Sequence, residues 1–499
     1  MADDILNSMS AVSTAMPIGE LLAYHAGKDA ALPAVTFEGV TTSYSELDIS
    51  SNSKARQLVA AGVGEGQVVT LSVPNGLEFY ETVFAVWKLG AVPNLVSSKL
   101  PSSELQAIVK LAKPCLVIAD ESARVEGWNF LATGTPPLTE VPGGALPTKT
   151  APHWKIGTSG GSTGRPKLIV DRHNCFFDPH KPPMNQKPGD TMLNPGPLYH
   201  NTPFLTSTHC LFAGGHVVEM GRFDPLRALE LIERHKVNWM SLVPTMMSRI
   251  WRLPAEQRES FDVSSVESVW HMASVCPVWL KQAWIDWFGP DRIFEVYGGT
   301  ELMGFTFITG GEWLTHKGSV GRPPPGYQMR ILDEQGKECA PGEVGEIYFL
   351  PAAGPNSSYE YIGAQAKAVD GWQTYGDLGH VDAEGYLYIA DRRTDMIVSG
   401  GANIFPAEVE AALDEHPDVQ SSIVIGLPDG DLGQRAHAIV QIAGANAEQG
   451  ADDLREFLSD KLARYKIPRT FEFTSKNLRD DAGKARRSQL REERVTHLS

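Results

Sequence analysis

Apolar runs alternate with segments of helical spacing along the first 120 residues of the chain. The apolar runs show no polar alternation, as expected of strands buried on both faces. They lie at residues 68–73, 92–96 and 115–119. Helical spacing, with cap residues or glycines at the ends, marks residues 43–63, 78–89 and those from 101 onward. This order predicts a parallel sheet covered by helices.

The alternation returns between residues 190 and 300 and then changes. Helices are predicted at residues 225–235 and from 278, with strands at 239–243 and 293–296. From about residue 319 short strands and turns predict a β-rich subdomain. A compact unit after residue 391 has helices at 406–413 and 452–462 and strands at 422–426 and 436–442. We therefore expect an α/β protein with a large N-terminal domain, residues 1–391, of doubly wound parallel sheets plus the β-rich subdomain, and a small α+β C-terminal domain, residues 392–499.

Composition and charge argue against some classes of protein. Of the 499 residues, 42% are hydrophobic and 21% are charged, as in ordinary globular proteins. The net charge of −16 argues against nucleic acid as a partner, because its phosphates need a clustered basic surface. The five cysteines are dispersed without metal-binding spacing, and neither a signal-peptide pattern nor a run of about 18 apolar residues occurs. These features predict a cytoplasmic protein without a membrane span.

Residues 158–167, TSGGSTGRPK, have the chemistry of a phosphate-binding loop. Three glycines allow close approach of the backbone, the hydroxyls donate hydrogen bonds, and Lys167 adds a positive charge. The spacing is not that of the kinase-type P-loop, since no serine or threonine follows Lys167. Taken alone, the loop is also compatible with a flexible surface connection.

Further motifs follow this loop in order. They are EVYGGTE at residues 295–301, YGDLG at 375–379, DRRTDMI at 391–397, GGANIFPAEVE at 400–410, and the segment 477–490. Together with the loop they resemble the adenylate-forming superfamily of acyl-CoA synthetases, luciferases and peptide-synthetase adenylation domains. The resemblance implies a ligase that uses ATP and Mg²⁺ to convert a carboxylic acid into its acyl-AMP and then transfers the acyl group to coenzyme A. It also implies a mobile C-terminal domain that turns about a hinge near residues 392–395 between the two half-reactions.

The resemblance assigns nucleotide, metal and coenzyme A to particular positions. Glu301, a ligand of the type that Mg²⁺ prefers, is expected to bind the metal together with Thr163. Asp377 only accepts hydrogen bonds and therefore suits the two hydroxyls of a ribose. An isolated acid at either place would be an ordinary turn residue. The residues expected to bind ATP or coenzyme A are Ser159, Gly160, Gly161, Ser162, Thr163, Gly164, Lys167, Ser274, Glu295, Val296, Tyr297, Gly298, Thr300, Asp377, Arg392, Gly400 and Gly401.

Lys484 is expected to be the catalytic cation, with His200 and Glu301 completing the catalytic set. The attacking carboxylate and the α-phosphate are both anionic, so their approach needs a positive charge where negative charge develops. The alternative is a solvated basic surface, because residues 479–491 contain four arginines beside Lys484. The Gly483-Lys484 pair and its place in the motif order favour the catalytic role.

Residues 197–204, PLYHNTPF, resemble the segment of CoA ligases that borders the acyl pocket. No aspartate lies between residues 191 and 210 to bind an amino-acid ammonium, so a carboxylic acid without that group is favoured. The motifs are similar to those of ligases for bile acids, steroid side chains and polycyclic terpenoid acids, and small side chains would leave room for such rings. The residues expected to contact the acid are Tyr199, His200, Asn201, Phe204, Ala273, Gly298, Gly299 and Met303.

Two other functions stay open. An adenylating enzyme could load the acyl group onto the phosphopantetheine of a carrier protein instead of coenzyme A. The second open function is that of a nucleotide-binding protein without catalysis. The retained charged residues of the motifs argue against it. A Rossmann dehydrogenase is disfavoured, because no strand–GxGxxG–helix unit occurs in the first sheet. The resemblance is also compatible with a homodimer.

Overall fold

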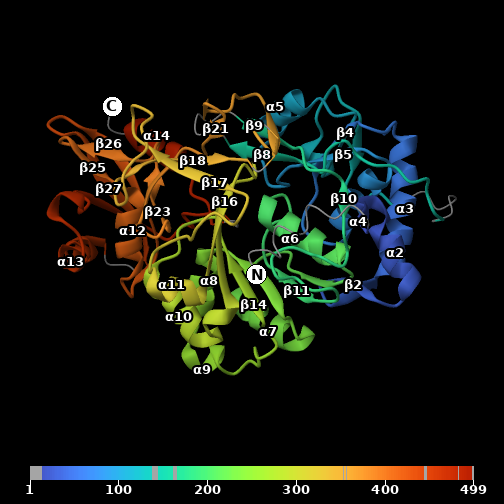
Figure 1. The fold of residues 1–499 in the computed structure, drawn as a ribbon, viewed down its shortest axis with the longest axis horizontal. Coiled ribbons are helices and arrows are strands. Elements are labelled where there is room, and N and C mark those ends of the chain that lie inside the picture. The colour runs from blue at the N-terminus through green and yellow to red at the C-terminus, as the bar shows by residue number, and fades with distance from the viewer. Residues whose placement is uncertain are drawn as a thin grey trace.

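The computed structural model describes residues 14–136, 144–160, 166–351, 353–355, 357–442, 447–480 and 483–496. The chain forms a large N-terminal part, blue to yellow in Figure 1, and a smaller C-terminal part, orange to red. Gly161, Ser162, Thr163 and Gly164, expected to bind phosphate, lie outside the described residues. Among the helices that the structure describes, none combines the length and the apolar character needed to cross a membrane.

The first predicted sheet is present, and its middle is parallel. Along the sheet the strand order is β19 (Tyr359–Ile362), β9 (Pro166–Asp171), β8 (Ile156–Gly160), β5 (Val92–Leu95), β4 (Val68–Ser72), β6 (Leu116–Ala119) and β7 (Phe130–Ala132). Strands β8 to β7 in this order are parallel, whereas β9 and β19 extend the sheet in antiparallel fashion. The connecting helices are α3 (Tyr44–Ala60), α4 (Leu77–Lys88) and α5 (Ser102–Ala112). The first helix begins after Ser43, which forms a reciprocal cap with Glu46.

A second, larger sheet lies beside the first. Its order is β16 (Phe305–Thr309), β15 (Ile293–Gly298), β14 (Ser268–His271), β13 (Trp239–Leu242), β11 (Thr191–Asn194), β12 (His216–Glu219), β2 (Pro33–Phe37) and β3 (Val40–Ser43). Only the two edge strands, β16 and β3, run antiparallel to their neighbours. Its helices include α6 (Asn201–Phe212), α7 (Pro225–His235), α8 (Pro244–Trp251) and α10 (Val278–Phe288). Helix α6 packs against α4 of the first sheet through Phe204 on Phe79 and Phe212 on Phe84.

The β-rich subdomain and the C-terminal part follow in the predicted order. The subdomain contains β17 (Gln328–Leu332), β18 (Gly345–Leu350), β20 (Ala368–Val369), β21 (Trp372–Gln373), β22 (Asp377–Val381) and β23 (Leu387–Arg392). The C-terminal sheet contains β24 (Ile397–Ser399), β25 (Ala402–Ile404), β26 (Val419–Asp429), β27 (Gly433–Ile442) and β28 (Thr470–Thr474), with helices α12 (Pro406–Asp414) and α13 (Ala447–Ser459). Residues 393–396 connect the two sheets.

The polar end of the chain forms a helix that the residue pattern did not predict. Helix α14 (Arg487–Thr496) has few apolar residues, but Leu490 and Val495 pack against the buried side chains of β26. Arg494 pairs with Glu472 of β28 at 2.6 Å. Tertiary contacts, rather than an apolar stripe, therefore stabilise this helix.

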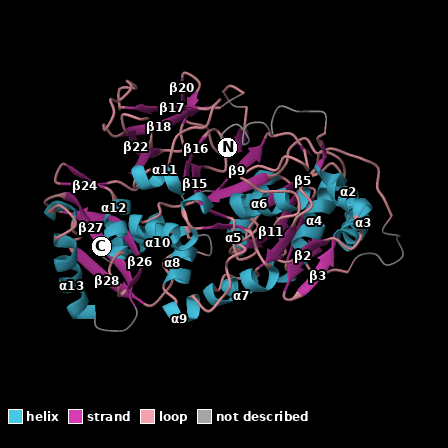
Figure 2. Cartoon of the chain, turned by 60° about the horizontal axis from the view of Figure 1, so that its bottom comes forward, coloured by secondary structure: helices cyan, strands magenta, loops and turns pink. Residues whose placement is uncertain are grey.

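The C-terminal part lies against the second sheet's helices. Figure 2 shows α12 and β26 beside α8 and α10. The guanidinium of Arg252, at the end of α8, donates to the carbonyl oxygens of Val419 and Asp414. Gly483 packs on the start of α8, where an added Cβ would lie 2.9 Å from Thr245 Oγ1. This arrangement turns the loop that carries Lys484 toward the N-terminal part.

Candidate functional site

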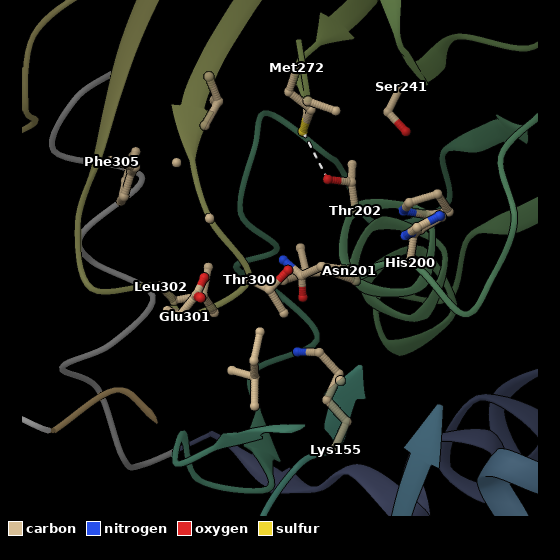
Figure 3. A pocket seen from close by; sticks show the side chains of 18 of the residues that line it. Lys155, His200, Asn201, Thr202, Ser241, Met272, Thr300, Glu301, Leu302 and Phe305 are labelled. Carbon is tan, nitrogen blue, oxygen red and sulfur yellow. Dashed lines mark hydrogen bonds between the residues drawn. The ribbon is translucent and has the colours of Figure 1, made fainter. Parts of the chain in front are cut away.

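A cavity of about 1060 Å³ opens where the two large sheets, the β-rich subdomain and the C-terminal part meet. It brings together residues of the separate motifs that the sequence singled out. These are Lys167, Tyr199, His200, Asn201, Ala273, Val296, Gly298, Gly299, Thr300, Glu301, Asp377, Arg392 and Lys484. Figure 3 shows Thr300 beside Asn201, the first residue of α6, with Glu301 to one side and His200 to the other. Lys167 and Lys484, which are 317 positions apart in the sequence, thus line one cavity.

Asp377 lies at one end of the cavity, held by two neighbours. The Tyr297 hydroxyl donates to its Oδ2 at 2.6 Å, and Arg392 Nε is 3.4 Å from its Oδ1. Asp377 is 8% exposed, and the Arg392 side chain is 68% exposed. The carboxylate is therefore fixed in orientation, while the arginine beside it is free to meet an anion.

Glu301 forms a second charged group with residues of the first sheet. The Tyr361 hydroxyl donates to Glu301 Oε1 at 2.5 Å, and the Lys167 ammonium lies 3.4 Å from the same oxygen. Lys167 also donates to the Tyr361 hydroxyl at 2.9 Å. Burial and the Glu301 charge hold the pKa of Tyr361 well above its usual range. Tyr361 was missed because β19, which carries it, gives no motif of its own and reaches β9 from far along the chain.

Strands β8 and β9 flank the phosphate loop, and β8 lies beside the Thr300 turn. Ser159 pairs with Lys167 and Gly160 with Pro166 across the two strands, and Lys167 lines the cavity. An added Cβ on Gly157 would lie 3.2 Å from Thr300 Cγ2, so the turn packs directly on this strand. Leu302 in the turn and Ala273 across the cavity both have positive φ, 50° and 78°. Such backbone is costly for these residue types and is often found at functional sites.

Lys484 enters the cavity from the C-terminal part. The loop that presents it is closed by hydrogen bonds of Asp480 and Lys484, in which each backbone N–H is 2.9 Å from an oxygen of the other residue. The exposed surface of Lys484 faces the cavity, and the surrounding protein desolvates its ammonium. Burial, and then the positive charge of Arg392, lower the pKa of Lys484, with Asp480 and Glu301 opposing that shift. A desolvated cation in this position interacts strongly with anions that enter.

Gly400 and Gly401 do not lie in the cavity. They form the exposed turn between β24 and β25, with φ of 58° and 81° that glycine adopts without strain. Of Lys484 and this glycine turn, Lys484 lines the cavity in this structure and the glycines do not.

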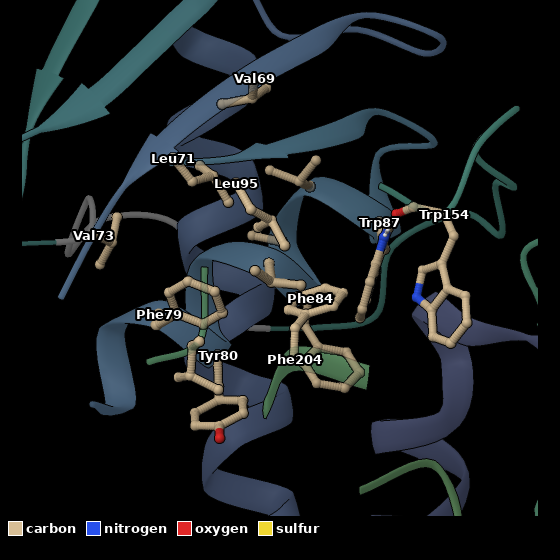
Figure 4. Close-up of a cluster of buried hydrophobic side chains, with 14 of the residues drawn as sticks. Val69, Leu71, Val73, Phe79, Tyr80, Phe84, Trp87, Leu95, Trp154 and Phe204 are labelled. Carbon is tan, nitrogen blue, oxygen red and sulfur yellow. Dashed lines mark hydrogen bonds between the residues drawn. The ribbon is translucent and has the colours of Figure 1, made fainter. Parts of the chain in front are cut away.

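Several residues predicted to contact ligands do not line the cavity in this structure. Phe204 and Met303 have no exposed surface, and Figure 4 shows Phe204 among the aromatic side chains of the core. Glu295 is buried under the cavity wall, where it pairs with Lys281 at 2.5 Å instead of facing a nucleotide. Tyr297 and Ser274 also do not line the cavity. Tyr297 instead supports Asp377 through its hydroxyl.

A buried network positions His200 at the start of α6. The backbone N–H of Leu198 donates to Asn75 Oδ1 at 2.9 Å, and the Asn75 amide donates to Glu219 Oε1 at 2.7 Å. The Tyr80 hydroxyl donates to Glu219 Oε2 at 2.6 Å. Burial raises the pKa of Glu219 to about 8, although these donors oppose that shift. The loop before His200 is therefore held by hydrogen bonds that link it to β12, through Glu219, and to α4, through Tyr80.

The cavity continues past the predicted acyl residues toward Trp154, Lys155 and His209. These residues belong to none of the motifs described above. A lysine between Trp154 and the apolar start of β8 was a weak signal, because a charge there needs a buried partner. Asp171 at the end of β9 supplies that partner at 2.5 Å.

The residues present suit Mg²⁺ carried by a triphosphate. Within the described parts of the chain, no three metal-ligating side chains cluster together. Mg²⁺ in nucleotide sites is commonly held by one or two carboxylates plus substrate phosphates. Glu301, next to Thr300 and Lys167, offers one such carboxylate.

Comparison with known proteins identifies the family. Residues 22–361 match the model of the AMP-binding enzymes, and residues 408–484 match that of the AMP-binding enzyme C-terminal domain. The chain belongs to this family. It is accordingly an AMP-forming ligase with the α/β adenylate-forming fold.

Relatives over nearly the whole chain include ligases with different acceptors. A fatty acid–[acyl-carrier-protein] ligase of Streptomyces coeruleorubidus is 30% identical, over 94% of this chain and 95% of its own. A feruloyl-CoA synthase of an Amycolatopsis species is 32% identical, over 92% and 95%. The o-succinylbenzoate CoA synthetase of Bacillus subtilis, solved with its acyl-adenylate intermediate, is 26% identical with a TM-score of 0.79, covering 96% of this chain and 98% of that one. The same enzyme has been solved with ATP and a magnesium ion.

Proposed function

We propose that this AMP-binding enzyme joins a carboxylic acid to coenzyme A in two steps, through an acyl-AMP. The observation that carries the proposal is the meeting of Lys484, Thr300, Glu301 and Asp377 around one cavity, although they come from separate motifs. An ATP-dependent adenylation needs a cation, a metal-binding carboxylate and a ribose acceptor within reach of one nucleotide. Relatives solved with ATP, magnesium and an acyl-adenylate support the same chemistry here.

In the first step a carboxylate oxygen bonds to the α-phosphorus of ATP as the bond to the bridging oxygen breaks and pyrophosphate leaves. Lys484 stabilises the charge that develops between these two anions. Asp377 accepts hydrogen bonds from the ribose, and Arg392 lies beside it to bind a phosphate or ribose oxygen. Mg²⁺ held by Glu301 would neutralise the departing phosphates. With the C-terminal part in the present position, the site is arranged for this step.

The second step requires a different face of the C-terminal domain. The thiolate of coenzyme A bonds to the acyl carbon, and AMP leaves with the former carboxylate oxygen. We propose that residues 392–499 turn about residues 393–396, withdraw Lys484 and bring Gly400 and Gly401 toward the cavity beside His200. The absence of these glycines from the cavity wall supports a domain that works with two faces.

The acid is proposed to contain one or more rings. Aromatic and apolar side chains cover much of the inner cavity, among them Phe177, Trp270, Met272, Phe305 and Phe307. The named feruloyl and succinylbenzoate enzymes among the relatives act on ring-containing acids. A polycyclic acid of the bile-acid or terpenoid type is the largest member of this proposed class.

A second acceptor is favoured by one relative. The similarity to a fatty acid–[acyl-carrier-protein] ligase supports transfer to a carrier-protein phosphopantetheine as the alternative second step. Both acceptors present the same pantetheine thiol, so the adenylation site alone does not separate them.

The test is acid-dependent release of AMP from MgATP, with a panel of fatty, aryl, cinnamic, steroidal and diterpenoid acids. Coenzyme A and a phosphopantetheinylated carrier protein are added in parallel reactions, and thioesters are identified by mass. We expect AMP and an acyl-CoA with a ring acid. Thioester on the carrier alone would replace coenzyme A as the acceptor, and selective use of straight-chain acids would remove the ring-acid proposal.

A further inference from the structure

The inner end of the cavity contains buried polar atoms without a hydrogen-bond partner among the described residues. His209 is 6% exposed and Trp154 is 8% exposed, and both line the cavity. Among the described residues, neither His209 Nδ1 nor Trp154 Nε1 has a hydrogen-bond partner. Leaving a buried donor or acceptor unpaired costs about 1–3 kcal/mol. Two such atoms side by side indicate a site that is completed by a ligand.

The two rings are fixed rather than adaptable. The His209 imidazole stacks on the Trp154 indole with centroids 5.2 Å apart and on the Phe177 ring at 5.1 Å. Burial, and then the Lys155 charge, lower the pKa of His209 to about 3. The imidazole is therefore neutral in ordinary buffers, with one nitrogen that donates and one that accepts.

Lys155 adds donors to the same place. Its ammonium lies 5.0 Å from the Trp154 ring centroid and pairs with Asp171 at 2.5 Å. Figure 3 labels Lys155 among the residues that line the cavity. An ammonium has three donors, and Asp171 takes one of them.

The site lies at a definite depth from the reacting carboxylate. The cavity follows one face of α6, from Asn201 and Thr202 through Leu205 to His209. At a rise of 1.5 Å per residue, Asn201 and His209 are about 12 Å apart along the helix. Asn201 is next to Thr300 at the adenylation end, so a group at His209 is remote from the carboxylate that reacts.

The charges favour a neutral group. Lys155 is already balanced by Asp171, and on the outer rim Lys181 faces the cavity together with Asp178. A second carboxylate on the substrate would meet Lys155, whose charge Asp171 already balances. Burying a carboxylate without its own cation is unfavourable. A plain hydrocarbon end would leave the indole N–H and the imidazole unpaired. A hydroxyl both accepts and donates, and therefore satisfies both kinds of group.

Resting on the proposed function, we propose that the acid carries a hydroxyl on the end remote from its carboxylate, and that Trp154, Lys155 and His209 bind this hydroxyl. A site built to hydrogen-bond a substrate hydroxyl rejects the analogue that lacks it much more strongly than an apolar pocket rejects a change of size. Specificity would then be determined at the inner end of the cavity, far from Lys484.

The test compares matched acids that differ in one hydroxyl. The pairs are para-hydroxycinnamic acid with cinnamic acid, and 4′-hydroxybiphenyl-4-carboxylic acid with biphenyl-4-carboxylic acid. The measured quantity is the ratio of kcat/KM values for pyrophosphate release within each pair. For the wild type we expect at least one pair to favour the hydroxylated acid by about 100-fold or more.

The variants His209→Phe and Trp154→Phe keep a ring in place and remove the polar atom. Each should lower the ratio by about 10-fold or more, chiefly through the hydroxylated acid. His25→Phe is the matched control, since His25 is a buried histidine outside the cavity that bonds the Phe212 carbonyl oxygen at 2.9 Å. It should leave the ratio unchanged even where it lowers stability. If one cavity variant does not fold, the ratio of kcat/KM values measured with the other variant tests the inference.

Adenylation of these acids with no preference for the hydroxylated members would overturn this inference but not the proposed function. Ratios unchanged in both cavity variants would do the same. No AMP or pyrophosphate release with any acid of the wider panel would overturn the proposed function and, with it, the inference that rests on it.

Discussion

Replacing Lys484 by methionine should separate the two half-reactions. Methionine keeps the length and apolar stem of the side chain but removes the ammonium, and the Gly483 contact with α8 is untouched. Loss of one preorganised group that stabilises developing charge costs about 10²- to 10³-fold in rate, or about 2.7–4 kcal/mol. Because the Lys484 side chain lines the cavity and burial lowers its pKa, we expect a loss within that range.

The assay has two arms. Single-turnover release of pyrophosphate measures adenylation, and chemically prepared acyl-AMP with coenzyme A measures thioester formation. Lys484→Met should lose the first and retain the second within about threefold, because Lys484 is withdrawn in the second step. Lys476→Met, an exposed lysine of the same domain, is the control and should change neither. Equal losses in both arms would refute the reasoning that the domain works with two faces.

Three further predictions concern the supports of the site. Asp377→Ala should raise the KM for ATP by about 10- to 100-fold in the pyrophosphate assay, since the ribose loses its fixed acceptor. Arg252→Ala should slow adenylation by up to about tenfold while sparing thioester formation, because its hydrogen bonds to the carbonyl oxygens of Val419 and Asp414 stabilise the present domain arrangement. For Glu219 the folded pKa is raised from 4.5 to about 8, so the native state holds a proton that the unfolded chain has lost. Its contribution to stability is full below about pH 4.5 and falls as the pH rises toward 8, by up to about 1.4 kcal/mol per unit. Urea unfolding at several pH values should show this slope in the wild type and lose it in Glu219→Gln.

Each of these has a result that would contradict it. An unchanged KM for ATP in Asp377→Ala would remove the ribose assignment. Equal slowing of both half-reactions by Arg252→Ala would indicate general damage rather than a shifted domain equilibrium. An identical pH slope of unfolding in Glu219→Gln and the wild type would show that Glu219 is ionised in the native protein.

Much of the fold follows from local pattern. The apolar run at residues 68–73 became β4 (Val68–Ser72), and the predicted helix 225–235 became α7 with the same bounds. Such segments are buried on both faces or carry a clear cap, so sequence and structure agree. Helix α14 was missed, because its apolar contacts come from Leu490 and Val495, too few to form a periodic pattern, and its stability comes from distant partners such as Glu472.

The site was predictable where a motif fixes the backbone and less so where side-chain direction matters. Thr300 and Glu301 reach the cavity because their turn packs on Gly157. On α6, Asn201 faces the cavity whereas Phe204, three residues on, faces the core. Proximity to a motif does not determine which face of a helix a residue occupies. Trp154 and His209 come from segments that meet only after both sheets have packed.

The central claim, activation of the acid as an acyl-AMP, is tested most directly by following oxygen. A substrate acid labelled with ¹⁸O in both carboxylate oxygens is incubated with the enzyme, MgATP and coenzyme A, and the products are analysed by mass. We expect one ¹⁸O atom in AMP, because thiolate attack leaves the bridging oxygen on the phosphate. Label in orthophosphate with formation of ADP, or unlabelled AMP, would contradict it.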